Sequence, residues 1–136
     1  MTTFDFGYGP VPAHQHPRGG GWVADTARVE DSAYIGPDAR VYGDARVYGD
    51  ARVSGDAQVS GGAKLAKSSD YLLIGPIGSR AAFMTWTRSD NCIATGCFRG
   101  TVKEFLAAVR ETHGDNEHAK AYRAAVKFIR AMEKLA

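Results

Sequence analysis

Histidine is the residue type that most readily does acid–base chemistry or binds a metal, and this 136-residue chain holds four. Two of them form the tripeptide His14-Gln15-His16 near the N-terminus. In an extended segment, residues two apart point to the same side, so His14 and His16 could share a metal ion. A stable site needs at least a third ligand, and the sequence shows no evident candidate. We therefore predict neither a metal nor a cofactor.

The other reactive side chains lie in the C-terminal half. His113 falls at the end of an expected helix, where it suits the helix dipole and favours a capping role over that of a base. Cys97 and His113 could act as nucleophile and base, but nothing beyond their coexistence supports this pair. Cys92 and Cys97 are too few for a disulfide scaffold, although they could pair if they faced each other across a hairpin. We predict no catalytic residue and no enzymatic activity.

A row of cations lies near the C-terminus. Its members recur at spacings of three and four, which place them on one side of a helix: Lys120, Arg123, Lys127, Arg130 and Lys134. Such a row is most often a solvated face. The alternative is a docking surface for nucleic acid, a nucleotide or an acidic protein. A membrane-surface role is weaker, because the apolar side of this helix is needed for packing. We name these five as candidate partner-binding residues.

A second group of cations lies within a six-residue repeat that starts at Val23. The hexads are VADTAR, VEDSAY, IGPDAR, VYGDAR, VYGDAR, VSGDAQ, VSGGAK and LAKSSD. Each begins with an aliphatic residue, and the fifth position is alanine in all but the last. A period of six fits neither a helix nor a plain strand, but it suits a solenoid of short strands joined by tight corners. Three hexads would then make one coil, with Gly-Asp pairs at the turns.

Stacking of residues eighteen apart predicts which side chains form columns. The inward ladders are Val23, Val41 and Val59; Val29, Val47 and Leu65; and Ile35 and Val53. Outside, Arg28, Arg46 and Lys64 share a column, where like charges need nearby carboxylates, solvent or an anionic partner. Solvated arginines are the commonest arrangement. As candidate anion-binding residues, in clefts between subunits, we name Arg28, Arg40, Arg46 and Arg52.

The hexads over about residues 22–68 resemble the repeat of the left-handed parallel β-helix, the fold of many acyltransferases and of some carbonic-anhydrase-like proteins. The resemblance implies a homotrimer and, in the enzymes, a histidine or histidine-bound zinc between subunits. This sequence departs from that pattern, because no histidine lies between Val23 and Asp70. A hexapeptide acyltransferase is therefore the least favoured alternative. Eight hexads make fewer than three coils, whose open ends need caps.

We expect three regions: an N-terminal arm or cap at residues 1–21, the β-helix at 22–68 and an α+β domain at 69–136. In the last, DYLLIGPIGS, RAAFMTWTR and NCIATGCF predict a three-stranded sheet, with SDN as a turn. Thr101 and Glu104 predict a capping box that opens a helix ending near Gly114. A second helix is expected from about Asn116 to Leu135, and both helices should pack on the sheet.

The composition is that of a soluble globular protein. Hydrophobic residues make up 44%, charged residues 24%, and the net charge is +2. We find no apolar run long enough to span a membrane and no secretory signal. We therefore expect no membrane partner and a reduced, cytoplasmic setting.

The head YGPVPAHQHPRGGGWVADTARV, the hexads, the segment GCFRGTVKEFLAAVRETHGDN and a final helix together resemble small hexapeptide-repeat proteins of bacteriophages and prophages. The resemblance implies the cytoplasm of a bacterial host and no established chemistry. By analogy, we expect a non-catalytic trimer that binds a host protein, a ribonucleoprotein complex or nucleic acid, as inhibitors of CRISPR and other defence systems do. The alternatives are a sponge for a nucleotide or another small anion, and a structural component of the virion.

Overall fold

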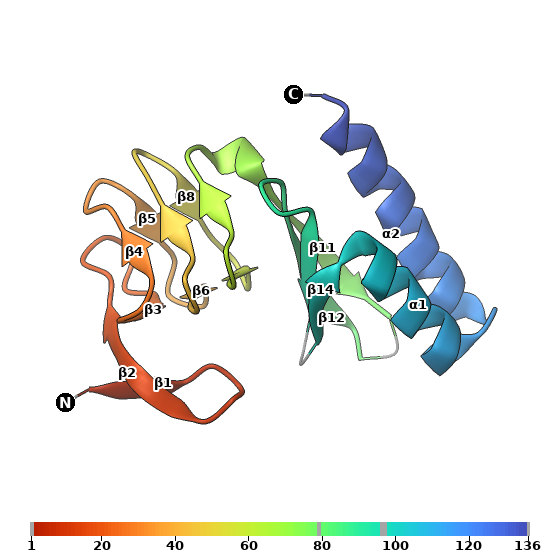
Figure 1. Ribbon diagram of the computed structural model, residues 1–136, viewed down its shortest axis with the longest axis horizontal. Helices are drawn as coiled ribbons and strands as arrows, with labels where there is room; N and C mark the ends of the chain where they lie inside the picture. Colours follow the sequence, from red (N-terminus) through yellow and green to blue (C-terminus); the bar gives the residue numbers. More distant parts are fainter. Residues whose placement is uncertain (1, 79, 96–97, 136) are drawn as a thin grey trace.

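The protein consists of a β-solenoid followed by an antiparallel sheet and two helices, and Figure 1 shows these parts in that order from left to right. The computed structural model describes residues 2–78, 80–95 and 98–135. None of the helices in these ranges is long and apolar enough to cross a membrane.

The solenoid is made of very short parallel strands. They are β3 (Trp22–Ala24), β4 (Arg28–Val29), β5 (Tyr34–Ile35), β6 (Arg40–Val41), β7 (Arg46–Val47), β8 (Arg52–Val53), β9 (Gln58–Val59) and β10 (Lys64–Leu65). Strands eighteen residues apart pair in parallel, as in Val23 with Val41 and Val41 with Val59. The other two predicted ladders are confirmed as well. In one, Val47 pairs with both Val29 and Leu65, and in the other Ile35 pairs with Val53.

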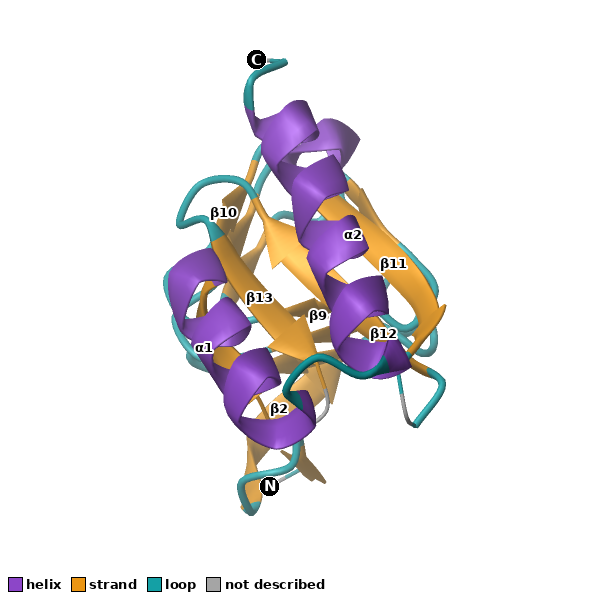
Figure 2. Cartoon of the chain, turned by 90° about the vertical axis from the view of Figure 1, so that its right-hand side faces the viewer, coloured by secondary structure: helices purple, strands orange, loops and turns teal. Residues whose placement is uncertain are grey.

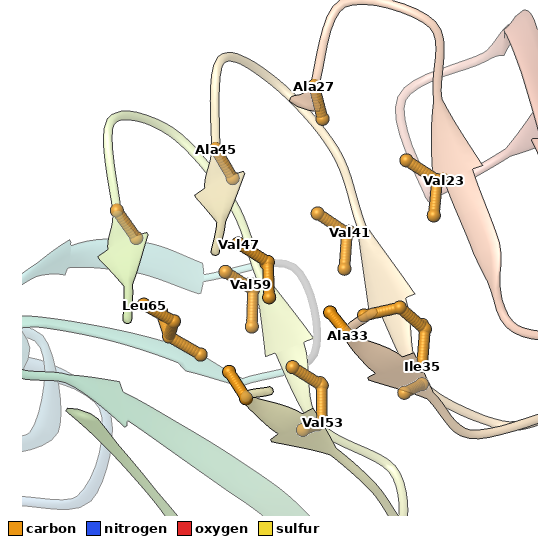
Figure 3. Close-up of a cluster of buried hydrophobic side chains, with 14 residues drawn as sticks. Val23, Ala27, Ala33, Ile35, Val41, Ala45, Val47, Val53, Val59 and Leu65 are labelled. Atoms are coloured by element: carbon orange, nitrogen blue, oxygen red, sulfur yellow. The ribbon is translucent and has the colours of Figure 1, made fainter. Parts of the chain in front are cut away.

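The repeat folds this way because each position of the hexad meets a different constraint. The first residue points into the coil, where Val23, Ile35 and Leu65 are fully buried (Figure 3). The alanine at position five is also buried, because a larger side chain would not fit inside the corner. From the fourth hexad to the seventh, the third residue is a glycine with positive φ, which suits a tight turn. Backbone hydrogen bonds then join the coils, as from Arg28 N–H to Ala45 O at 2.9 Å.

The N-terminal arm covers the first coil. Strands β1 (Thr3–Asp5) and β2 (Pro10–Gln15) form a hairpin, and β2 adds to β3 in antiparallel orientation. The segment after β2 covers the edge of β5 through hydrogen bonds from Ile35 N–H to Arg18 O and from Gly21 N–H to Ile35 O. Phe4 of the hairpin stacks on Trp22, with ring centroids 4.9 Å apart. These contacts pair backbone groups that an open coil would leave exposed.

The sheet after the solenoid is sandwiched between the last coil and the helices. A 3₁₀ turn, η1 (Ser68–Asp70), leads into β11 (Tyr71–Ile77), β12 (Ala82–Thr87), β13 (Cys92–Thr95) and β14 (Phe98–Thr101), which pair in sequence order. Alternate residues of β12 point to opposite faces. Met84 and Trp86 pack against the helices, while Thr85 faces the solenoid and accepts a hydrogen bond from it.

The prediction of a three-stranded sheet was wrong, because the described residues form four strands in it. The expected strand NCIATGCF is divided, with β13 ending at Thr95 and β14 beginning at Phe98, its antiparallel partner. Apolar periodicity alone does not separate one such strand from two short ones. The SDN turn is confirmed: Thr87 Oγ1 donates to Asp90 Oδ1 at 2.6 Å, and Trp86 Nε1 donates to Asn91 Oδ1 at 2.8 Å.

Helices α1 (Val102–His113) and α2 (Glu117–Glu133) lie in front of the strands in Figure 2. The predicted capping box of α1 is confirmed: Thr101 Oγ1 accepts from Glu104 N–H at 3.2 Å, and Glu104 Oε1 accepts from Thr101 N–H at 2.9 Å. Asn116 caps α2 by accepting from Ala119 N–H at 3.0 Å. Val126 and Ile129 of α2 are buried against the sheet.

Side chains close the last coil of the solenoid. In earlier coils, the N–H groups of residues 34, 36, 40, 46 and 48 donate to carbonyls of the following coil. The equivalent groups of the last coil donate instead to side-chain oxygens: Arg52 to Ser68, Ser54 to Tyr71, Gln58 to Thr85, Lys64 to Ser89 and Ala66 to Asp70. These distances run from 2.8 to 3.1 Å. We call this contact the seam.

Arg99 of β14 adds a charged member to the seam. Its Nε donates to Ser60 Oγ at 2.9 Å, and its Nη2 donates to Ser60 O at 3.0 Å and to Asp90 Oδ2 at 2.6 Å. One guanidinium therefore links the last coil to the turn between β12 and β13. Such charge-assisted bonds are among the stronger polar contacts in proteins.

Candidate functional sites

The five cations near the C-terminus lie on one exposed side of the last helix. Lys120, Arg123, Lys127 and Arg130 belong to α2, and Lys134 is its C-terminal capping residue. All five are exposed, while the opposite side of α2 packs into the core with Ala119, Ala125, Val126 and Ile129. We call the five residues the basic face.

One member of the basic face has a structural partner. Arg123 Nη2 bonds to Asp115 Oδ1 at 2.5 Å, and its Nη1 donates to Gly114 O at 3.4 Å. Arg123 therefore holds the turn between α1 and α2. Among the described residues, the other four cations of the basic face make no ion pair. Their charges are therefore not balanced by an ion pair within the described part of the chain.

Two large apolar side chains are exposed next to these cations. Phe128 is 51% exposed and Leu135 is 66% exposed. A helix advances about 100° per residue, so Phe128 lies roughly 100° around the axis from Lys127. An aromatic residue beside a row of lysines and arginines is a composition found at protein and nucleic-acid interfaces.

The four candidate anion-binding arginines divide among the three faces of the solenoid. Arg28 and Arg46 pair in register, and Lys64 continues their column. Arg40 lies on another face, and its guanidinium is 5.3 Å from the ring centroid of Phe4. Arg52 lies on the third face, and its guanidinium is 4.3 Å from the ring centroid of Tyr34. The structure therefore brings Arg28 and Arg46 together but separates Arg40 and Arg52 from them. The latter two stabilise the fold through cation–π contacts.

The column of Arg28, Arg46 and Lys64 has no carboxylate within ion-pair distance in the described part of the chain. The nearby Glu30 is engaged elsewhere, since its Oε2 accepts from Gly49 N–H at 2.9 Å. A groove of about 490 Å³ lies beside Arg28, with His14, Glu30 and Tyr48 in its wall. Three like charges on neighbouring strands would repel each other less with an anion between them.

The two histidines of the N-terminal arm do not point to one side, so this expectation was wrong. His14 is exposed on β2, and its Nδ1 donates to Asp25 Oδ1 at 2.8 Å. His16 is buried, and its Nε2 donates to Ala33 O at 2.7 Å. Strand β2 ends at Gln15, and the chain then turns, so the alternation of a strand does not extend to His16.

The reactive residues of the C-terminal half are described only in part. Cys97 lies outside the described residues, so its proposed pairing with Cys92 and its proposed role beside His113 stay untested. Burial raises the pKa of the Cys92 thiol, and the neighbouring Asp90 raises it further. A thiol with a raised pKa is a weak nucleophile at neutral pH. His113 ends α1, with its ring 5.6 Å from that of His118 and 5.9 Å from that of Tyr122.

Sequence reasoning missed a cluster of aromatic residues at the N-terminal hairpin. Phe6 is buried and stacks on Tyr42 with ring centroids 5.0 Å apart, and Tyr8 lies 6.3 Å from Tyr42. Burial raises the pKa of the Tyr42 hydroxyl. The only signal in the sequence was the density of aromatics in FDFGY, which indicates packing but names no partner.

A family model described as the YdcK beta solenoid repeat matches residues 39–55 and, in a second overlapping copy, residues 45–61. The match lies within the hexads and agrees with the parallel pairing of β6 with β9 and of β7 with β10. Comparison with curated proteins and with solved structures gave no match. Residues 39–61 thus carry a β-solenoid repeat.

Proposed function

We propose that this chain is a non-catalytic, phage-type accessory protein that binds a macromolecule of the bacterial host through the basic face. In this proposal the solenoid is a left-handed parallel β-helix of fewer than three coils, and it assembles as a homotrimer in the host cytoplasm. The target would be a host protein or ribonucleoprotein complex, such as one that serves defence. The resemblance to small phage hexapeptide-repeat proteins supports this class of target.

The observation that carries the proposal is the exposure of the basic face, in which four of the five cations make no ion pair with a carboxylate of the described residues. Lys120, Lys127, Arg130 and Lys134 project from a helix whose other side is firmly packed, so their charges stand on a stable platform. Positive charge arranged in this way steers an anionic surface towards the helix. Phe128 beside the cations adds apolar area that a polyelectrolyte contact alone would not need.

The test compares two variants that each lose three positive charges. One carries Lys120→Gln, Lys127→Gln and Lys134→Gln on the basic face, and leaves Arg123 to hold its turn. The control replaces Arg28, Arg46 and Lys64 by glutamine in the solenoid column. Tagged proteins are used for pull-downs from bacterial lysate at low salt, with and without nuclease, and the captured proteins are identified by mass spectrometry.

We expect the wild type and the column variant to enrich the same host protein, and the basic-face variant to lose it. Capture that disappears with nuclease would identify the partner as nucleic acid. Equal capture by both variants would show that the basic face is only a solvated surface. Circular dichroism and thermal unfolding would establish that all three proteins are folded.

A second candidate function has its own observation. The column of Arg28, Arg46 and Lys64 lacks carboxylate partners in the described residues, which favours a sponge for a nucleotide or another small anion. Denaturation of the wild type should then release a bound anion that mass spectrometry detects. The column variant should not carry this anion. Loss of that anion from the basic-face variant instead would exclude the column as its site.

A further inference from the structure

The N-terminal hairpin and the solenoid enclose a cavity of about 320 Å³. Its walls combine aromatic rings, small apolar groups and one acidic side chain: Phe6, Tyr8, Val11, Pro12, Asp25 and Tyr42. The volume is at the small end of the range for ligand sites, which is about 300–1,000 Å³. The β1–β2 hairpin, whose residues line the cavity, lies at the end of the molecule away from α2 (Figure 1).

The rings of Phe6 and Tyr42 are held in place by the fold. Phe6 is only 7% exposed and lies nearly parallel to Tyr42, with an angle of 22° between the rings. The Tyr42 hydroxyl donates to Gln58 Oε1 at 3.2 Å. Gln58 does not line the cavity, so this bond fixes the ring and leaves the cavity wall apolar. A site whose rings are already positioned loses little side-chain entropy when a ligand enters.

Asp25 places a fixed negative charge at the cavity. Its backbone N–H donates to Pro12 O at 2.9 Å, which ties it to strand β2. Its carboxylate accepts a hydrogen bond from His14 Nδ1 at 2.8 Å. This hydrogen bond holds the carboxylate in one orientation. The side chain is 53% exposed, so a ligand can reach it.

Exposed apolar side chains gather at the same place. Tyr8 is 62% exposed and Val11 is 38% exposed. Among the described residues, the other two large hydrophobic side chains with high exposure are Phe128 and Leu135, near the C-terminal end. A local concentration of exposed apolar groups next to a cavity marks a binding site more often than chance.

We propose that this cavity binds a small organic cation with a methylated ammonium group, of the kind that choline carries. The negative faces of aromatic rings attract such a cation, and the methyl groups contact the apolar wall. Asp25 balances the charge. A metal ion would need several oxygen or nitrogen ligands, and a single carboxylate among aromatic rings does not supply them. An anion would be repelled by Asp25 and by the ring faces.

The experiment compares choline with 3,3-dimethyl-1-butanol, which has the same shape but no charge. Each is added to ¹⁵N-labelled full-length protein at constant ionic strength, and the amide signals of Gly9 and Gly43 in the cavity wall are followed by NMR. We expect saturable shifts with choline and binding about tenfold weaker with the neutral alcohol. Equal affinity for both compounds would overturn the proposal, because the cavity would then be merely apolar.

Variants test the named residues. Tyr8→Leu and Asp25→Asn should each weaken choline binding at least threefold, as expected for the loss of one ring face or one charge. Tyr48→Leu is the matched control, because Tyr48 lies outside the cavity wall, and its affinity should equal that of the wild type. Thermal midpoints identify any variant that is unfolded. Unchanged binding in both cavity variants, or no saturable shift up to about 50 mM choline, would refute the site.

Discussion

At the scale of single residues, the corners of the solenoid depend on glycine. Gly43 has a φ of +66°, in the left-handed region that other residues adopt at a cost. A Cβ placed on it would also lie 2.9 Å from Gly61 N, in the backbone of the next coil. The glycine at this point of the hexad therefore serves two purposes: it allows the turn, and it lets neighbouring coils stack closely.

We predict that Gly43→Ala lowers the free energy of unfolding by about 1–3 kcal/mol, through backbone strain and the approach of Gly61. Gly62→Ala is the control in a later hexad, because a Cβ at Gly62 meets nothing within 4 Å. That change should have almost no effect or stabilise slightly. Urea unfolding followed by circular dichroism measures both. Equal losses in the two variants would contradict this account of the corner.

At the scale of elements, the two helices start at caps that the structure shows in full. The capping box of α1 joins Thr101 and Glu104 in both directions, and Asn116 caps α2. Each cap satisfies N–H groups that have no partner within the helix. The Glu104 carboxylate accepts from the backbone and side chain of Thr101, and these bonds lower its pKa below the ordinary value of 4.5.

This lowered pKa predicts the direction of a pH effect on stability. Ionised Glu104 stabilises the folded state at pH values above its unfolded pKa, and this contribution is lost as the pH falls through the lower folded pKa. In Glu104→Gln the side-chain oxygen remains but cannot ionise. The difference in unfolding free energy between wild type and Glu104→Gln should therefore shrink as the pH falls below about 4.5.

Urea unfolding at a series of pH values measures that difference. Glu111→Gln removes the same charge farther along α1 and controls for the change in net charge. A difference between wild type and Glu104→Gln that grows on acidification would be the wrong sign and would exclude the capping contribution.

At the scale of the whole molecule, the seam makes the sheet a cap for the solenoid. Its acceptors come from η1, from β11 and β12 and from the turn after β12, and they stand where the next coil would place carbonyls. Thr85 is 2% exposed, so its hydrogen bond with Gln58 N–H is shielded from water. The loss of a buried acceptor leaves an unpaired donor, which is costly.

We predict that solenoid and sheet unfold together. Thr85→Val keeps the shape but removes the acceptor, and it should cost about 1–3 kcal/mol. Native-state hydrogen exchange measures the free energy of opening at single amides. This free energy should fall by the same amount at the amide of Val47 in the solenoid and at the amide of Ile93 in the sheet. Thr112→Val is the control, because it makes the same substitution at an exposed position of α1. A loss confined to Ile93 would mean that the two parts are separate cooperative units.

Local patterns explain why much of the architecture was predictable. The period of six indicates which residue of each hexad faces inward, and adding eighteen to one residue of a column gives the next residue of the same column. The capping box is likewise read from two residues three apart. The exposure of the basic face also follows from helical spacing, since the apolar side of α2 had to be buried. In each case the determining contacts are between near neighbours or between identical repeats.

The sequence by itself therefore determined the solenoid, the position of its ladders and the helical caps. Only the tertiary structure decided that the sheet closes the last coil and that Arg123 differs from the other cations. It also decided that Asp25, bonded to His14, lines the same cavity as Phe6 and Tyr42. The seam joins residues 27 apart, as in Gln58 and Thr85, or 39 apart, as in Ser60 and Arg99. No periodic pattern encodes such pairs, because they form only when separately folded elements come together and each buried polar group finds its partner.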